Sequence, residues 1–98
     1  MILKIERGKV ELRDDRGILI RTLVYRDAVD ADLRSDGKVV VTDKNGRVEL
    51  RDDRGTLIRT LVYRGAVSAR WSGNDVVVRC ANGKTELRKE NGILIRTI

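Results

Sequence analysis

The sequence predicts an all-β protein built from tandem four-stranded antiparallel meanders, and three observations point to this fold. Residues 8–29 return as residues 46–67 with three differences in 22 positions, and a more divergent copy occupies residues 83–98. Each copy contains apolar runs of strand length separated by glycine, asparagine and aspartate. No apolar stripe of useful length has helical spacing. A repeat of this length indicates that each unit is one supersecondary element that packs against its neighbours.

The 98 residues are expected to form a single repeat domain with units at 1–28, 29–66 and 67–98. The chain has no phenylalanine or proline, one tryptophan and two tyrosines, so valine, leucine and isoleucine must form the core. A chain this short buries only about 60–65% of the surface that its unfolded form exposes. We therefore expect a modest stability.

In the middle unit, four strands are expected at residues 29–34, 38–42, 47–51 and 56–61. Gly46 supplies the positive φ of a tight hairpin, and Gly55 suits a type I turn that is closed by a glycine bulge. The run from Val39 to Val41 is apolar at every position. A strand with one solvated face would alternate instead, so this run indicates a sheet that is covered on both faces.

The turn also predicts the register of the hairpin at residues 9–23. A turn centred on residues 15 and 16 places Glu11 opposite Arg21 and Leu12 opposite Ile20. The same register in the other two units pairs Glu49 with Arg59 and Glu86 with Arg96. Opposite charges that face each other across two strands contribute about 0.2–1 kcal/mol.

A small four-stranded sheet that is covered on both faces and repeated in series is typical of a β-propeller blade. Residues 29–61 resemble a WD-repeat blade, and the resemblance extends over the whole chain. The matching positions are Val29, Ala31, Ser35, Asp36, Gly37, Val48, Leu50, Asp52, Gly55, Thr60 and Leu61, and then Val67, Ala69, Trp71, Ser72, Thr85, Leu87, Gly92 and Thr97. The chain departs from the family pattern where arginines replace its tryptophan, and it has no histidine. The resemblance implies a propeller that presents loops to partners.

The first unit begins inside what would be its second strand, so the sequence predicts about two and three-quarter blades. Propellers typically close with 4–8 blades, and an unclosed end leaves a strand edge exposed. We therefore expect a head-to-tail homo-oligomer, with a dimer that forms a six-bladed ring as the favoured form. The alternative fold is a closed three-fold monomer, either a β-prism or a β-trefoil.

Charge and cysteine content restrict the partners and the compartment. The formal net charge of +6 favours an anionic partner, although solubility alone also favours it. The single cysteine excludes an intrachain disulfide. The first residues lack the apolar core of a signal peptide, and no apolar run approaches the ~18 residues of a membrane span. The expected location is the cytoplasm, with no membrane partner.

The sequence offers little for catalysis. Without histidine there is no ordinary catalytic triad, and Cys80 has no visible base beside it, so it is expected to be structural. The paired acids at residues 14–15 and 52–53 are typical of turns. The segment Asp32-x-Arg34-x-Asp36 is not expected to bind calcium, because an arginine occupies a ligand position. No catalytic residue, metal or cofactor is predicted.

Arginines at equivalent positions of the repeat are the candidate residues for binding a partner or an anion. They are Arg13, Arg51, Arg88, Arg16, Arg54, Arg26 and Arg64. Around a ring such arginines could hold an anion or a nucleic-acid backbone, whereas the competing interpretation pairs them with glutamates of the neighbouring strands. The sequence therefore predicts a non-catalytic binding or assembly module that associates with itself and presents loops to a protein partner. Nucleic-acid binding and lectin-like carbohydrate binding are the alternatives.

Overall fold

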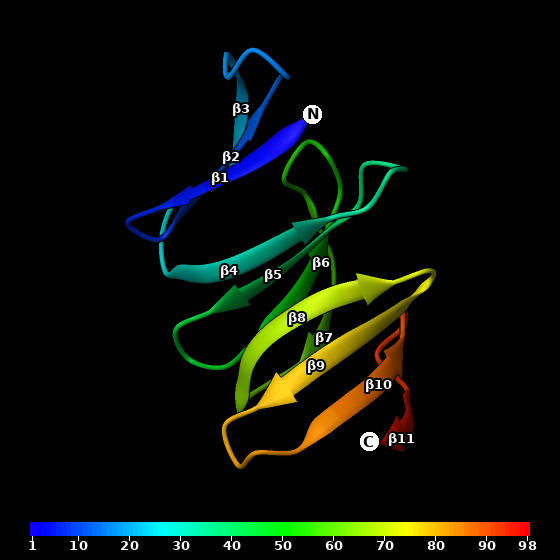
Figure 1. Cartoon of the computed structure of the whole chain (residues 1–98). Helices are drawn as coiled ribbons and strands as arrows, with labels where there is room; N and C mark the ends of the chain where they lie inside the picture. The colour runs from blue at the N-terminus through cyan, green and yellow to red at the C-terminus, as the bar shows by residue number, and fades with distance from the viewer.

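The computed structural model describes residues 1–98 as 11 β-strands in three antiparallel sheets, and it contains no helix (Figure 1). Sheet I contains β1 (Ile2–Glu6), β2 (Lys9–Arg13) and β3 (Leu19–Val24). Sheet II contains β4 (Ala28–Leu33), β5 (Val39–Asp43), β6 (Val48–Arg51) and β7 (Leu57–Val62). Sheet III contains β8 (Ala66–Ser72), β9 (Asp75–Cys80), β10 (Thr85–Lys89) and β11 (Leu94–Thr97).

The three sheets follow one another in an open row, from blue to red in Figure 1. The predicted all-β meander is confirmed, and each strand expected in the middle unit lies within one residue of its observed bounds. The missing strand is confirmed too, because sheet I has three strands where the other sheets have four. The closed three-fold alternative is wrong: strands pair in ladders only within each sheet, and the row does not return on itself to close.

The turns before β3 and β7, the last strands of sheets I and II, are built by an aspartate and a glycine. Gly17 N donates to Asp14 O and Asp14 N donates to Ile18 O, both at 2.9 Å. The Asp14 carboxylate accepts the backbone N–H groups of Arg16 and Ile18, and Asp52 does the same in the next unit. Gly17 has a φ of +84°, which glycine adopts without strain. The interpretation of these acids as turn residues is confirmed for Asp14 and Asp52.

The predicted hairpin register is wrong by one residue. Glu11 lies opposite Thr22, and Leu12 lies opposite Arg21. The other two hairpins repeat this shift, with Glu49 opposite Thr60 and Glu86 opposite Thr97. The cause is a shift in register between Leu12 and Arg13, in addition to the expected bulge at Gly17. This shift leaves Ile20 without a pairing residue on β2, and Ile20 is 45% exposed.

The core lies between the sheets rather than inside any one of them. Alternate valines of β5 serve both sides: Val39 and Val41 pack toward sheet I, and Val40 packs toward sheet III. The cluster between sheets I and II consists of Val10, Leu12, Leu23, Ala28, Val39 and Val41. The cluster between sheets II and III consists of Val40, Val48, Leu50, Leu61, Val62, Ala66, Ala69, Val76 and Val78. The prediction that the middle sheet is covered on both faces is therefore confirmed.

Replacing Gly55 by alanine should destabilise the protein by about 1–3 kcal/mol more than replacing Gly17. Both glycines have a φ near +85°, so both variants carry the same backbone strain. A Cβ on Gly55 would lie 2.7 Å from the carbonyl oxygen of Leu23, whereas a Cβ on Gly17 meets nothing. Urea unfolding of the two variants measures the difference, and equal losses would contradict the close approach of sheet II to sheet I.

Candidate functional site

Successive sheets are connected by three-residue linkers, residues 25–27 and 63–65, and at each linker a pair of backbone hydrogen bonds joins the two sheets. Between sheets I and II, Ala28 N donates to Gly8 O at 3.0 Å, and Lys44 N donates to Asp27 O at 2.8 Å. Between sheets II and III the same bonds recur, from Ala66 N to Gly46 O and from Ala81 N to Gly65 O. The linkers therefore fix each sheet against the next in the same way.

A groove opens beside each linker, and the candidate arginines line it. Arg26 and Arg51 line a groove of about 410 Å³ between sheets I and II. Arg64 and Arg88 line the equivalent groove of about 320 Å³ between sheets II and III. The structure thus brings together two pairs of arginines that are far apart in the sequence. Arg13 lines neither of these grooves.

Arg13, Arg51 and Arg88 each bind their own sheet. Arg13 Nη1 donates to the carbonyl oxygen of Gly17 at 2.6 Å, and Nη2 donates to Glu11 Oε1 at 2.7 Å. Arg51 and Arg88 repeat both bonds, with Gly55 and Glu49 and with Gly92 and Glu86. Each glutamate lies two residues earlier on the same strand, so the expectation that these arginines pair with a glutamate across two strands is wrong. These guanidinium groups tie the end of a strand to its turn.

The remaining candidates are exposed. Arg16 and Arg54 lie at the tips of the turns, and Arg26 and Arg64 lie in the linkers, each directly after an exposed tyrosine. None of these four side chains makes an ion pair within 4.0 Å. They are therefore the candidate arginines that are free to meet a partner.

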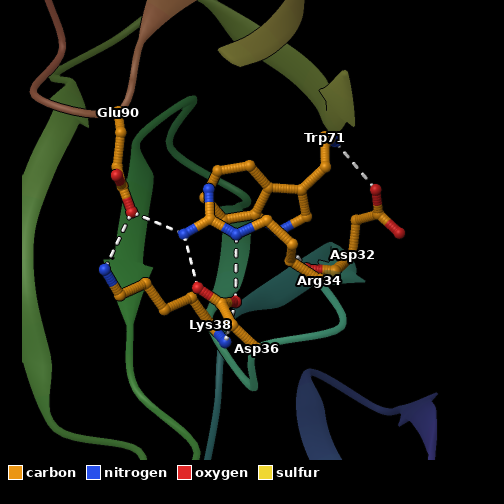
Figure 2. A network of polar contacts seen from close by, with 6 residues as sticks. All are labelled: Asp32, Arg34, Asp36, Lys38, Trp71 and Glu90. Atoms are coloured by element: carbon orange, nitrogen blue, oxygen red, sulfur yellow. Dashed lines mark hydrogen bonds and ion pairs between the residues drawn. The ribbon is translucent and has the colours of Figure 1, made fainter. Parts of the chain in front are cut away.

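A polar network that the sequence did not predict joins sheets II and III (Figure 2). The guanidinium carbon of Arg34 lies 4.0 Å from the centroid of the Trp71 ring, which is a cation–π contact. Arg34 also binds Asp36 through Nε at 2.9 Å and Nη2 at 2.7 Å, and it reaches Glu90 of sheet III at 2.8 Å. Lys38 Nζ donates to the same oxygen of Glu90 at 3.0 Å. The Arg34 side chain is only 13% exposed.

The inner strands β4 and β8 are tied by further bonds. Trp71 N donates to Asp32 Oδ2 at 2.8 Å, and Trp71 Nε1 donates to Asp32 O at 3.2 Å. Arg70 pairs with Asp30 beside them. Trp71 packs against the cluster between sheets II and III. Sheet I has no inner strand, and its contact with sheet II lacks these bonds.

The charged side chains of the network shift one another's pKa values. The hydrogen bond from Arg34 lowers the pKa of Asp36 to about 2, and bonds from Lys38 and Arg34 lower the pKa of Glu90. The hydrogen bonds to both acids raise the pKa of Arg34. The network therefore holds two sheets together through matched charges.

Neither the cysteine nor the acidic residues form a reactive or metal-binding group. Burial raises the pKa of the Cys80 thiol, which keeps it protonated. No three His, Cys, Asp or Glu side chains gather as a group that could hold a metal ion.

The chain matches no family model and no curated protein. Its structure is similar to the crystal structure of BamB from Moraxella catarrhalis, with a TM-score of 0.73 and 17% sequence identity. The similarity covers 98% of this chain and 31% of that chain, so the 98 residues span about a third of BamB. The likeness shows the fold, which is that of a partial β-propeller. No helix of the chain is long and apolar enough to cross a membrane.

Replacing Arg34 by alanine should lower the free energy of unfolding by about 1–3 kcal/mol, because the change removes the stacked ring contact, leaves Asp36 without its guanidinium partner and leaves Glu90 with Lys38 alone. Arg54→Ala removes the same side chain from an exposed turn and should cost less than about 0.5 kcal/mol. Urea unfolding compares the two. An equal effect would mean that the network adds nothing to the contact between sheets II and III.

The ion pairs of the network should also make the free energy of unfolding depend on pH. Asp36 has an ordinary pKa of 3.8 and Glu90 one of 4.5, and both values are lowered in the folded chain. The unfolded chain then binds more protons, so the free energy of unfolding falls as the pH drops from about 4.5 toward 2. An Asp36→Asn, Glu90→Gln double variant should show a smaller fall over this range in pH-dependent urea unfolding. A slope identical to that of the unmodified chain would contradict these pKa shifts.

Proposed function

We propose that the chain is a non-catalytic assembly module that associates head to tail through its two open sheet faces and presents its loops to a protein partner. One observation carries the proposal. Gly55 packs on Leu23 of the preceding sheet, and Gly92 packs on Leu61, but Gly17 meets nothing. At the other end of the row, Ile98 occupies the repeat position of these two leucines and is 68% exposed.

The linker contacts lead to the same conclusion. The carbonyl oxygens of Gly8 and Gly46 each accept the N–H of the residue directly after a linker, and a Cβ on either glycine would lie within 3 Å of that linker's backbone. Gly83 holds the third of these repeat positions and meets nothing within 4 Å. The two ends thus expose opposite halves of a contact that the chain makes twice internally. Such a contact is heterologous, and copies that are joined by it form a closed ring when the rotation from one copy to the next completes a circle. A dimer that forms a six-bladed ring is the favoured form.

Two differences in charge at the ends weaken this contact between copies. Lys4 lies opposite Glu11, and its side chain is 52% exposed. In sheets II and III the equivalent residues are the buried Val41 and Val78, which lie opposite Glu49 and Glu86. In a contact between copies, Asp15 would also take the place of Glu90, and Asp75 would take that of Lys38. Two carboxylates would then meet where the chain has an ion pair. We therefore expect an association that is weaker than the internal stacking.

The loops that the module presents are its linkers. Tyr25 with Arg26, and Tyr63 with Arg64, form two equivalent exposed pairs of an aromatic and a cationic side chain. Tyrosine and arginine are enriched where protein–protein interfaces hold most of their binding energy. This composition supports a protein as the partner at the linkers.

Replacing Lys4 by valine should strengthen self-association about tenfold, because it restores the apolar side chain that sheets II and III bury at the equivalent position. Lys44→Val removes the same charge from an exposed turn and should leave association unchanged. Light scattering coupled to size-exclusion chromatography over a range of concentrations measures the mass of each protein. A chain and a Lys4→Val variant that both stay monomeric at every concentration would contradict head-to-tail assembly.

A further inference from the structure

Sheet I lacks the inner strand that both other sheets have. Its strand order is β1-β2-β3, whereas β4 and β8 complete sheets II and III on the same side. The edge of β1 is therefore unpaired and lies beside β4 (Figure 1). An unpaired edge offers its N–H and C=O groups to another extended chain.

The turn after β1 shows which groups point outward. Arg7 and Gly8 form a two-residue turn with positive φ at both positions, 53° and 80°, between the paired residues Glu6 and Lys9. In such a turn the flanking pair is hydrogen-bonded, and bonded pairs alternate along the ladder. The N–H and C=O groups of Leu3 and Ile5 thus face away from β2. In sheet II their places are held by Val40 and Thr42, which pair with β4.

An apolar pocket of about 380 Å³ lies next to this edge. It is lined by Met1, Ile2, Leu3, Ala31, Asp32 and Leu33, which come from the start of sheet I and from β4. The pocket therefore lies where β1 meets β4, the side on which sheet I lacks a strand. It offers apolar surface to an incoming strand whose backbone bonds to Leu3 and Ile5.

The contact between β4 and β8 shows what the incoming strand must carry. Asp32 lies opposite Val40, and its carboxylate accepts the N–H of Trp71. Leu33 on β4 is equivalent to Trp71 on β8, because Leu33 lies opposite Val39 and Trp71 lies opposite Val76. Because Arg34 N donates to Lys38 O and bonds alternate, the N–H of Leu33 points away from β5. A carboxylate opposite Leu3 would accept it.

We propose that sheet I captures an extended acidic segment from another molecule, which pairs antiparallel with β1 and places an Asp opposite Leu3. The segment follows the pattern of β4, in which aspartates alternate with alanine and leucine. Lys4, on the same edge strand, pairs with Glu6 at 3.3 Å but is 52% exposed, so its ammonium group can also meet a carboxylate of the guest. This capture needs only sheet I and β4 of one chain, so it does not depend on head-to-tail assembly.

The probe is a fluorescent peptide with the sequence of residues 28–35, titrated with the whole 98-residue chain and followed by anisotropy. The expected result is saturable binding, with slower amide hydrogen exchange at Leu3 and Ile5. Asp32→Asn in the peptide should weaken binding several-fold, and Asp32→Pro, which removes an N–H that faces β1, should weaken it at least about tenfold. Equal binding by all three peptides would overturn the proposal.

A matched pair of protein variants tests the same edge from the other side. Ile5→Pro removes one outward N–H, whereas Ile5→Thr keeps it and installs the residue that sheet II has at this place. Ile5→Pro should lower the affinity for the peptide at least about tenfold, and Ile5→Thr should change it by less than about threefold. Equal affinities would overturn the proposal, as would protection of amides other than those of β1 and Leu33. If Ile5→Pro does not fold, as seen by circular dichroism, the Asp32→Pro peptide decides the outcome.

Discussion

Face-to-face stacking of the sheets is the interaction on which the rest of this structure depends. No sheet has a core of its own: both clusters of buried side chains lie between sheets, and β5 contributes valines to each of them. A three- or four-stranded sheet of this composition would expose apolar side chains on two faces if it stood alone. Each sheet is therefore stable only against a neighbour, as in other repeat proteins. The same dependence leaves a face without a neighbour at each end of the row.

Two kinds of contact keep the stacked sheets in alignment. The linker hydrogen bonds and the close approach of Gly55 and Gly92 to the preceding sheet occur at both contacts, so they define the repeat itself. The network around Arg34 and Trp71 occurs only between sheets II and III, because it depends on two adjacent inner strands. Sheet I, which has no inner strand, is attached to the row by its apolar cluster and its linker bonds. This difference makes the two contacts unequal and leaves the edge of β1 open.

The strands, the turns and the missing inner strand could be predicted because each follows from residues that are close in sequence. Glycines at fixed positions mark the turns, and the apolar run of β5 shows that both of its faces are covered. The hairpin register could not be predicted, since the extra residue at Ile20 has no signature of its own beside the glycine bulge at Gly17. The network was missed because Arg34 and Trp71 lie in different units, and their contact depends on how the sheets stack. An arginine two residues before Asp36 was a weak local signal for that ion pair.

Amide hydrogen exchange of the folded chain, measured at a concentration low enough to keep it monomeric, tests the role of stacking most directly. If neighbours stabilise each sheet, the amides of β5 in the middle sheet should exchange most slowly, because that strand is covered on both sides. The amides that pair β1 with β2 and β10 with β11 should exchange faster, since each of these sheets has one open face. Protection in sheets I and III that equals or exceeds that of β5 would contradict this account. Each sheet would then be stable without its neighbours.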